Sequence, residues 1–149
     1  EHLSSQGISR LLNKFSGVLG ISGVSSDMRE IEAAIGQGHE RAILAMRMYD
    51  YRIKKYIGSY TAVLGGLDVL VFTGGVGENQ TSTRSEVCKN MEYLGLEIDE
   101  ELNASVRGKE ALISTPRSKV KVAVIPTNEE LTIAMDTIEI IGWKKQEED

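Results

Sequence analysis

Cysteine, proline, aromatic residues and long apolar runs are all scarce in this chain of 149 residues. The single cysteine, Cys88, excludes an intramolecular disulfide and is typical of a reducing compartment. No apolar run approaches the roughly 18–20 residues that cross a bilayer, and the N-terminus lacks the apolar core of a signal peptide. We therefore expect a cytoplasmic protein with no membrane partner. Because the chain also lacks an initiator methionine, we expect it to be a piece of something longer.

Positive charge is also in short supply. The net charge is −5, no basic tract is present, and aromatic residues make up 5% of the chain. A nucleic-acid surface needs a basic stripe with stacking rings, so we expect no nucleic-acid partner. With 41% hydrophobic and 26% charged residues, the composition is that of a globular protein large enough for one compact domain.

One stretch joins a strand pattern to a cluster of glycines. Residues 67–73 read LDVLVFT, an apolar run that predicts a strand buried on both faces, as in a parallel sheet. Gly74, Gly75 and Gly77 follow in a predicted turn, where glycine lets a ligand approach the backbone closely. The turn has no lysine after its glycines, and position 80 is Gln80, so neither the Walker pattern nor GxGxxG is present. From the spacing alone, a structural turn and a ligand contact are both open.

Apolar periodicity and capping residues predict the helices. Residues 39–64 carry the strongest pattern, an amphipathic helix whose tyrosine and methionine stripe we expect to pack in the core. Thr83 and Glu86 have the spacing of a capping box. The predicted helices span residues 8–15, 29–34, 39–64, 81–94 and 127–141, and residues 16–26 are expected to form a loop.

The remaining pattern predicts strands. Residues 120–126 read VKVAVIP and predict a second buried strand, whose exit Pro126 marks. Residues 96–103 predict a short strand that runs into a polar turn, and residues 111–114 predict a further short strand at a sheet edge. Alternating strands and helices favour an α/β fold with a mainly parallel sheet flanked by helices. Two strong strands are too few for a complete sheet. The last helix has an expected inner face of Leu131, Ala134, Ile138 and Ile141, and a charged tail follows at residues 143–149.

Polar residues near the loop and the strand ends are candidates for ligand contact. Either Asp27 caps a helix and Arg29 is solvated, or Arg29 reaches a phosphate, since a guanidinium suits bidentate phosphate contact. Glu129 either interacts with a helix dipole or holds Mg²⁺, which takes a few carboxylates plus water and phosphate oxygens. Because both strong strands would end at the same sheet edge, Glu78, Asn79 and Glu129 are expected to converge there.

Three stretches resemble the acetate kinase family, the acetate/propionate kinases of the sugar-kinase, Hsp70 and actin superfamily. They read SGVLGISGVSSDMREIEAA (residues 16–34), VFTGGVGENQTSTR (residues 71–84) and VIPTNEELTIAMDT (residues 124–137), and they occur in the family's order and approximate spacing. KKYIGSY at residues 54–60 also agrees. The resemblance covers nearly the whole chain and implies an incomplete ribonuclease-H-like domain.

The resemblance implies a phosphotransferase that converts ATP and acetate to ADP and acetyl phosphate, with Mg²⁺ as cofactor, in a homodimer. Asp27, Met28 and Arg29 match the family's nucleotide-binding DMR segment, and Glu129 matches its magnesium-binding glutamate. The family's glycine segment, which lies against the adenosine, corresponds to Gly75, Val76, Gly77, Glu78 and Asn79.

The resemblance is to the C-terminal part of the family, so residues 1–149 are expected to be a C-terminal nucleotide-binding domain fragment. The family's N-terminal domain, the opening strands of this domain, the HLGNG-like phosphate loop, and the active-site arginines and histidine have no counterpart here. We therefore expect no catalytic residue in this chain and no activity from it alone. Two alternatives stay open: a propionate or other short-chain acyl kinase fragment, and a non-catalytic dimerisation or structural module.

Overall fold

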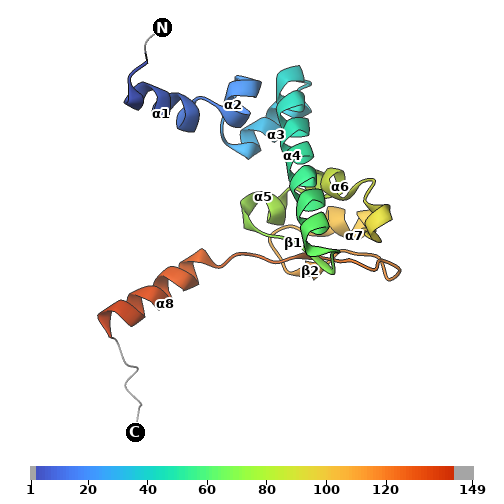
Figure 1. Cartoon of the computed structure of the whole chain (residues 1–149). Helices are drawn as coiled ribbons and strands as arrows, with labels where there is room; N and C mark the ends of the chain where they lie inside the picture. The colour runs from blue at the N-terminus through green and yellow to red at the C-terminus, as the bar shows by residue number, and fades with distance from the viewer. Residues whose placement is uncertain (1–2, 143–149) are drawn as a thin grey trace.

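A computed structural model describes residues 3–142. Four helices come first, and a small sheet with further helices follows (Figure 1). The helices are α1 (Ser5–Lys14), α2 (Gly17–Ser22), α3 (Met28–Gly36), α4 (Glu40–Leu64), α5 (Gly74–Asn79), α6 (Thr81–Cys88), α7 (Glu100–Ser105) and α8 (Glu129–Ile141), with a 3₁₀ turn at Glu92–Leu94. The strands are β1 (Val69–Phe72), β2 (Ala111–Leu112) and β3 (Lys121–Val124).

The segment predicted as a loop at residues 16–26 contains a helix, α2, so that prediction is wrong in part. Gly17 and Gly23 lie at the two ends of α2 with positive φ values of 64° and 70°, where glycine is tolerated. The six residues of α2 pack against α4, and this tertiary packing overrides their low helix propensity.

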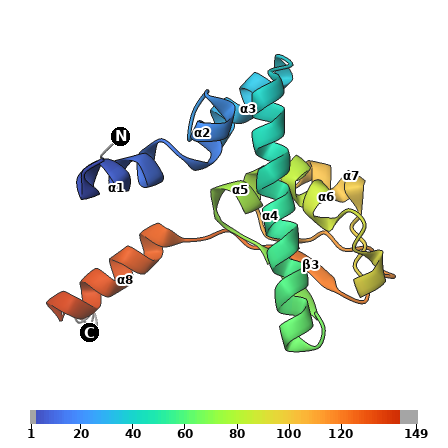
Figure 2. The ribbon, with the colours of Figure 1, turned by 45° about the horizontal axis from the view of Figure 1, so that its top comes forward.

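Helix α4 confirms the strongest helix prediction and runs past the whole body of the molecule (Figure 2). His39 caps it, because its Nδ1 accepts a hydrogen bond from the Ala42 backbone N–H at 3.2 Å. Only part of the expected core stripe is buried: Met46 is buried, whereas Tyr56 and Tyr60 are exposed and stack on each other with centroids 6.2 Å apart. Within residues 3–142, no helix is both long and apolar enough to cross a bilayer.

The sheet has three strands in the order β1–β3–β2. Strand β1 lies parallel to β3, with Phe72 opposite Val124, but β2 lies antiparallel to β3. The prediction of a mainly parallel sheet is therefore corrected to a mixed sheet. The segment between β2 and β3 holds a turn at Pro116 and is too short for the crossover that a parallel pair requires. The edge position of β2 is confirmed.

The expectation that β1 is buried on both faces is wrong. Val69 and Val71 are exposed, and only Phe72 is fully buried. Strand β1 lies at an edge of the sheet and packs against the core on one face only. Its continuous apolar sequence is therefore not a sign that both faces are buried. Strand β3 shows the alternation of a half-buried strand, with Val122 and Val124 in the core.

Two separate cores hold the molecule together. The larger one lies between the sheet, α6 and the segment from the 3₁₀ turn to α7; its buried members include Phe72, Val87, Met91, Leu96, Val106, Ile113, Val122 and Val124. The smaller one joins α3 to α4 through Ile31, Ala42 and Met46, with Met28 packed against it. The candidate site described below lies where elements of the two cores meet.

The helix predicted at residues 81–94 divides in two. Helix α6 ends at Cys88, and Asn90 has a positive φ of 59° before the 3₁₀ turn begins. The predicted capping box is wrong, because Thr83 is buried inside α6 and its hydroxyl donates to Gln80 Oε1 at 3.3 Å. The predicted strand at residues 96–103 reduces to one bridge between Ile98 and Ser114, followed by α7.

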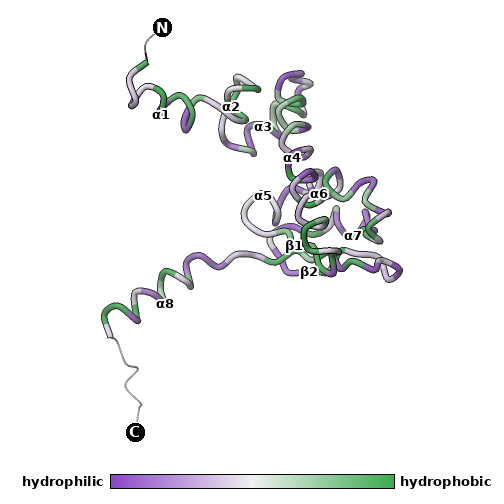
Figure 3. Tube along the Cα trace, viewed as in Figure 1, coloured by the Kyte–Doolittle hydropathy of each residue, from purple (hydrophilic) through white to green (hydrophobic). Residues whose placement is uncertain are grey.

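Helix α8 confirms the last predicted helix but not its surroundings. Asn128 is the cap, since its Oδ1 accepts from the Leu131 N–H at 3.0 Å. The expected inner face is exposed, because α8 extends away from the sheet and carries its apolar residues into solvent (Figures 1 and 3). These exposed residues are Leu131, Ala134, Ile138 and Ile141. The charged tail predicted at residues 143–149 lies outside the described residues.

Candidate functional site

A cavity of about 600 Å³ lies between the first turn of α3 and helix α5. The elements that form it are far apart in the sequence. Its walls are Asp27, Met28, Arg29 and Glu32 on one side, and Gly75, Val76, Asn79, Gln80 and Arg107 on the other. The structure thus brings the DMR segment and the glycine segment to one space.

Asp27 and Arg29 form a compact charged pair at the edge of this cavity. Asp27 Oδ1 accepts from the Arg29 backbone N–H at 2.9 Å, and its Oδ2 accepts from Arg29 Nη2 at 2.5 Å. The hydrogen bond from the Arg29 side chain, with a further one from its backbone, lowers the pKa of Asp27 to about 2. Asp27 is therefore ionised at any physiological pH. It caps α3, as one sequence reading predicts, and the Arg29 side chain is 88% exposed.

Met28 belongs to the α3 wall of the cavity. Its side chain packs against the smaller core, and its carbonyl oxygen accepts from Gln80 Nε2 at 3.4 Å. The α3 wall of the cavity therefore presents the apolar Met28 side chain next to the Asp27–Arg29 ion pair.

The glycine segment forms a helix, α5, rather than the predicted turn. Gly74 starts it with a positive φ of 70°. A Cβ on Gly77 would lie 3.1 Å from the Phe72 carbonyl carbon, so glycine lets α5 pack directly on the end of β1. Gly75 has open space at the Cβ position and lines the cavity with Val76. Gly77 is buried behind this wall and is not among the lining residues.

Glu78 and Asn79 diverge at the end of α5. Glu78 Oε1 accepts from the Thr127 backbone N–H at 2.7 Å and from its hydroxyl at 2.8 Å. These two bonds lower the pKa of Glu78 and hold α5 beside the exit of β3. Asn79 lines the cavity, and its Nδ2 donates to the Gly75 carbonyl at 3.0 Å. The two strand ends therefore meet through Glu78 and Thr127.

Glu129 is the first residue of α8 and lies two residues beyond Thr127. It is exposed and does not line the cavity. In the part of the chain that the structure describes, no three His, Cys, Asp or Glu side chains gather closely enough to hold a metal ion by themselves. A single exposed carboxylate still fits Mg²⁺, which fills its remaining positions with water and phosphate oxygens.

Sequence reasoning missed three residues of the cavity wall, namely Glu32, Gln80 and Arg107. Arg107 Nη1 donates to the Asn79 carbonyl, and the Gly108 N–H donates to the Glu78 carbonyl at 3.1 Å. Arg107 lies in the segment after α7, so only the folded chain reveals its place in the wall. For Glu32, the three-residue spacing from Arg29 was an available signal, because it places both on one face of α3.

Arg84 supports the glycine helix from behind. Its side chain is fully buried and donates to the carbonyls of Gly77 at 2.7 Å, Val106 at 2.6 Å and Asn103 at 3.1 Å, and to Asn103 Oδ1 at 2.8 Å. All four acceptors are uncharged oxygens, and burial lowers the pKa of this guanidinium. Arg84 thus joins α5, α6 and the end of α7 into one unit.

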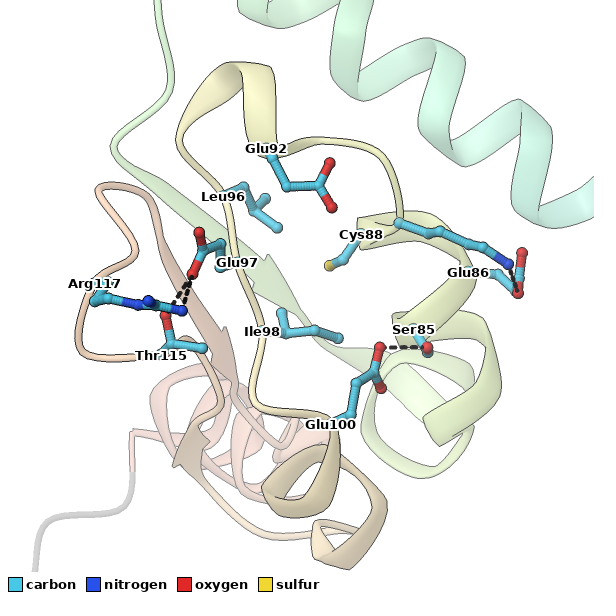
Figure 4. A pocket seen from close by; sticks show the side chains of 11 residues that line it. Ser85, Glu86, Cys88, Glu92, Leu96, Glu97, Ile98, Glu100, Thr115 and Arg117 are labelled. Atoms are coloured by element: carbon cyan, nitrogen blue, oxygen red, sulfur yellow. Dashed lines mark hydrogen bonds and ion pairs between the residues drawn. The ribbon is translucent and has the colours of Figure 1, made fainter.

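A second cavity of about 600 Å³ lies beside α6 and contains none of the predicted site residues (Figure 4). Three of its carboxylates already have partners: Glu100 with Ser85 at 2.7 Å, Glu86 with Lys89 at 3.2 Å, and Glu97 with Arg117 at 3.6 Å. Cys88 lines it as a buried thiol, and burial raises its pKa to about 12, so the thiol stays protonated.

Comparison with known proteins supplies the family. The acetokinase family profile matches residues 1–135. The acetate kinase of Bacteroides thetaiotaomicron is 66% identical over 141 residues, covering 95% of this chain and 35% of that protein. The crystal structure of Porphyromonas gingivalis acetate kinase matches with a TM-score of 0.86 and 63% identity, over 93% of this chain and 35% of that one. A propionate kinase from Francisella tularensis matches with a TM-score of 0.78 and 39% identity, over 90% and 34% of the two chains.

The chain spans about 35% of the length of the relatives it matches. The described residues accordingly form a mostly helical α/β portion of the acetate kinase fold, with a small mixed sheet of three strands. The match extends over both walls of the cavity and over the exit of β3. The chain belongs to the acetokinase family.

Proposed function

We propose that this chain is the nucleotide-side, C-terminal portion of an acetate kinase, which transfers phosphate from Mg-ATP to acetate and forms acetyl phosphate. The observation that carries the proposal is the cavity between α3 and α5. It gathers Asp27, Met28 and Arg29 from one segment with Gly75, Val76 and Asn79 from another, and both segments resemble nucleotide-contacting segments of the family.

The chemistry of the walls suits a nucleoside. Met28 and Val76 offer apolar contact to a base, while Gly75 leaves room for close approach to the backbone. Arg29 is exposed, and its planar guanidinium suits a phosphate oxygen pair. Glu129 would hold Mg²⁺ beside the phosphates, where the ion would neutralise developing charge during phosphoryl transfer. Gly77 and Glu78 support the site by holding α5 against β1 and Thr127.

The chain carries the nucleotide side only. Its 149 residues contain no HLGNG-like stretch, and the resemblance assigns the acceptor pocket to the part of the family that this chain does not match. We therefore expect the chain to bind Mg-ATP at micromolar to low millimolar strength and to make no acetyl phosphate alone. Calorimetric titration with Mg-ATP tests the first expectation, and trapping of acetyl phosphate with hydroxylamine tests the second. A titration that shows no binding of Mg-ATP would contradict the nucleotide site. Measurable acetyl phosphate would contradict the expectation that the chain is inactive alone.

Two further readings have specific support. The similarity to a propionate kinase keeps other short-chain acyl substrates open for the complete enzyme. The stacked, exposed Tyr56 and Tyr60 on α4, with Val63 and Leu64 beyond them, favour a surface for a second copy of the chain in a homodimer. Sedimentation of the wild type beside a Tyr56→Ser, Tyr60→Ser variant tests this surface, and a wild type that stays monomeric at high concentration argues against it.

A further inference from the structure

Gln80 lies at the junction of α5 and α6, and its side chain reaches back to α3. The residue is only 4% exposed. Its backbone N–H donates to the Val76 carbonyl at 2.9 Å, which ends α5. Its side-chain Nε2 donates to the Met28 carbonyl at 3.4 Å, across 52 residues of sequence. One residue therefore contacts both walls of the cavity.

The two walls come from two helix pairs that pack on each other. Helix α3 packs on α4 and α5 packs on α6, while α4 and α6 are also in contact. Among residues 3–142, the bond from Gln80 is the one hydrogen bond found between α3 and the α5–α6 pair. Packing between α4 and α6 connects the two walls indirectly, and the Gln80 bond adds a direct link between Met28 and the end of α5.

Thr83 fixes the direction in which the Gln80 amide points. The Thr83 hydroxyl is buried beside the Met46 sulfur, at 3.8 Å, and donates to Gln80 Oε1 at 3.3 Å. Because Oε1 is occupied, the amide N–H group faces the Met28 carbonyl. A donor at this position is required, since the Met28 carbonyl has only acceptor capacity.

We propose that Gln80 is a positioning residue of the nucleotide cavity, which acts through the Met28 carbonyl to hold the DMR turn at a fixed distance from the glycine helix. The inference rests on the proposed nucleotide site and extends it to the residue that directly follows the glycine segment of residues 75–79. Gln80 sets the width of the space into which the base fits, and Thr83 sets the orientation of Gln80.

Two variants test this role in the 149-residue chain, with Mg-ATP as the titrant. Gln80→Met keeps the length of the side chain but cannot donate, and we expect its Kd to rise roughly threefold to tenfold, the net effect of one hydrogen bond. Gln80→Glu donates to the Met28 carbonyl only when protonated, and burial raises the pKa of a carboxyl group. We therefore expect Gln80→Glu to bind nearly as wild type near pH 5 and to weaken as pH rises, beyond any change in the wild type. Gln37→Met, at an exposed glutamine that ends α3, is the matched control and should leave the Kd unchanged.

The outcomes separate the positioning role from the proposed function. If the wild type binds Mg-ATP and Gln80→Met binds equally well, or if Gln80→Glu follows the wild-type pH profile, the positioning role is overturned while the nucleotide site stands. If the wild type binds no Mg-ATP, the proposed function fails and the positioning role fails with it. Nuclear Overhauser contacts between the Gln80 amide protons and Met28 in the nucleotide-free chain check the contact itself, and their absence also overturns the inference.

Discussion

Replacing Arg84 with methionine should come close to unfolding the protein. The substitution keeps a long, flexible side chain in the space but removes every donor. Three backbone carbonyls, of Gly77, Asn103 and Val106, and the Asn103 side-chain oxygen then lose their hydrogen bonds from this residue. A buried acceptor left without a donor costs about 1–3 kcal/mol. If water reaches some of the four, the total loss is about 3–5 kcal/mol, against the roughly 5–15 kcal/mol that stabilises a typical domain.

Urea unfolding followed by far-UV circular dichroism measures this loss. We expect a much lower midpoint for Arg84→Met than for the wild type, or no cooperative transition at all. Arg84→Lys should lie between them, because an ammonium reaches only some of the acceptors. Arg107→Met is the matched control: Arg107 is exposed and its one hydrogen bond goes to the Asn79 carbonyl, so its loss should be below about 1 kcal/mol. A value for Arg84→Met within about 1 kcal/mol of wild type, with an unchanged urea slope, would refute the reasoning.

Three other substitutions test separate parts of the fold. Asp50 is buried, and burial raises its pKa from 3.8 to about 6, so its contribution to stability is full below about pH 4 and is lost as pH rises through about 6. Asp50→Asn should remove this loss, at most about 3 kcal/mol for a shift of two pKa units, and urea midpoints at pH 4.5 and 7.5 should differ less in the variant than in the wild type. Gly77→Ala should destabilise by about 1–3 kcal/mol, because its Cβ would press on the Phe72 backbone at 3.1 Å. Gly75→Ala, with open space around the added carbon, should be neutral or stabilising in the same thermal melts, and equal effects at the two glycines would contradict the packing argument.

The sequence predicted correctly those elements whose formation depends on residues close together in the chain. The spacing of apolar residues identified α4, the cap at Asp27 was correct, and the runs around Val71 and Val122 located β1 and β3. The failures share one cause, which is packing between distant segments. Gly20 lies inside α2 because that helix packs on α4, and the glycines after β1 form a helix because Arg84 and Thr127 hold it.

The candidate site divides in the same way. Asp27, Met28 and Arg29 were identified from sequence together with Gly75, Val76 and Asn79, and the cavity brings these residues into one space. Gln80 and Arg107 were missed because their hydrogen-bond partners come from other parts of the fold. A glutamine after a glycine segment matches no known motif. Its role is visible only in the folded chain, where its side chain contacts the Met28 carbonyl.

The anchoring of Thr127 by Glu78 also fixes the point from which α8 leaves the sheet. The two hydrogen bonds hold the chain just before the helix, which extends away from the sheet for 13 residues. At about 1.5 Å per residue, α8 is about 20 Å long, so a rotation of about 10° at Thr127 would move its far end by about 3 Å. Glu129 lies next to the centre of that rotation and would move only a fraction of an ångström. A reorientation of α8 about the exit of β3 would therefore shift the exposed apolar residues at its far end while leaving the carboxylate expected to hold magnesium nearly in place.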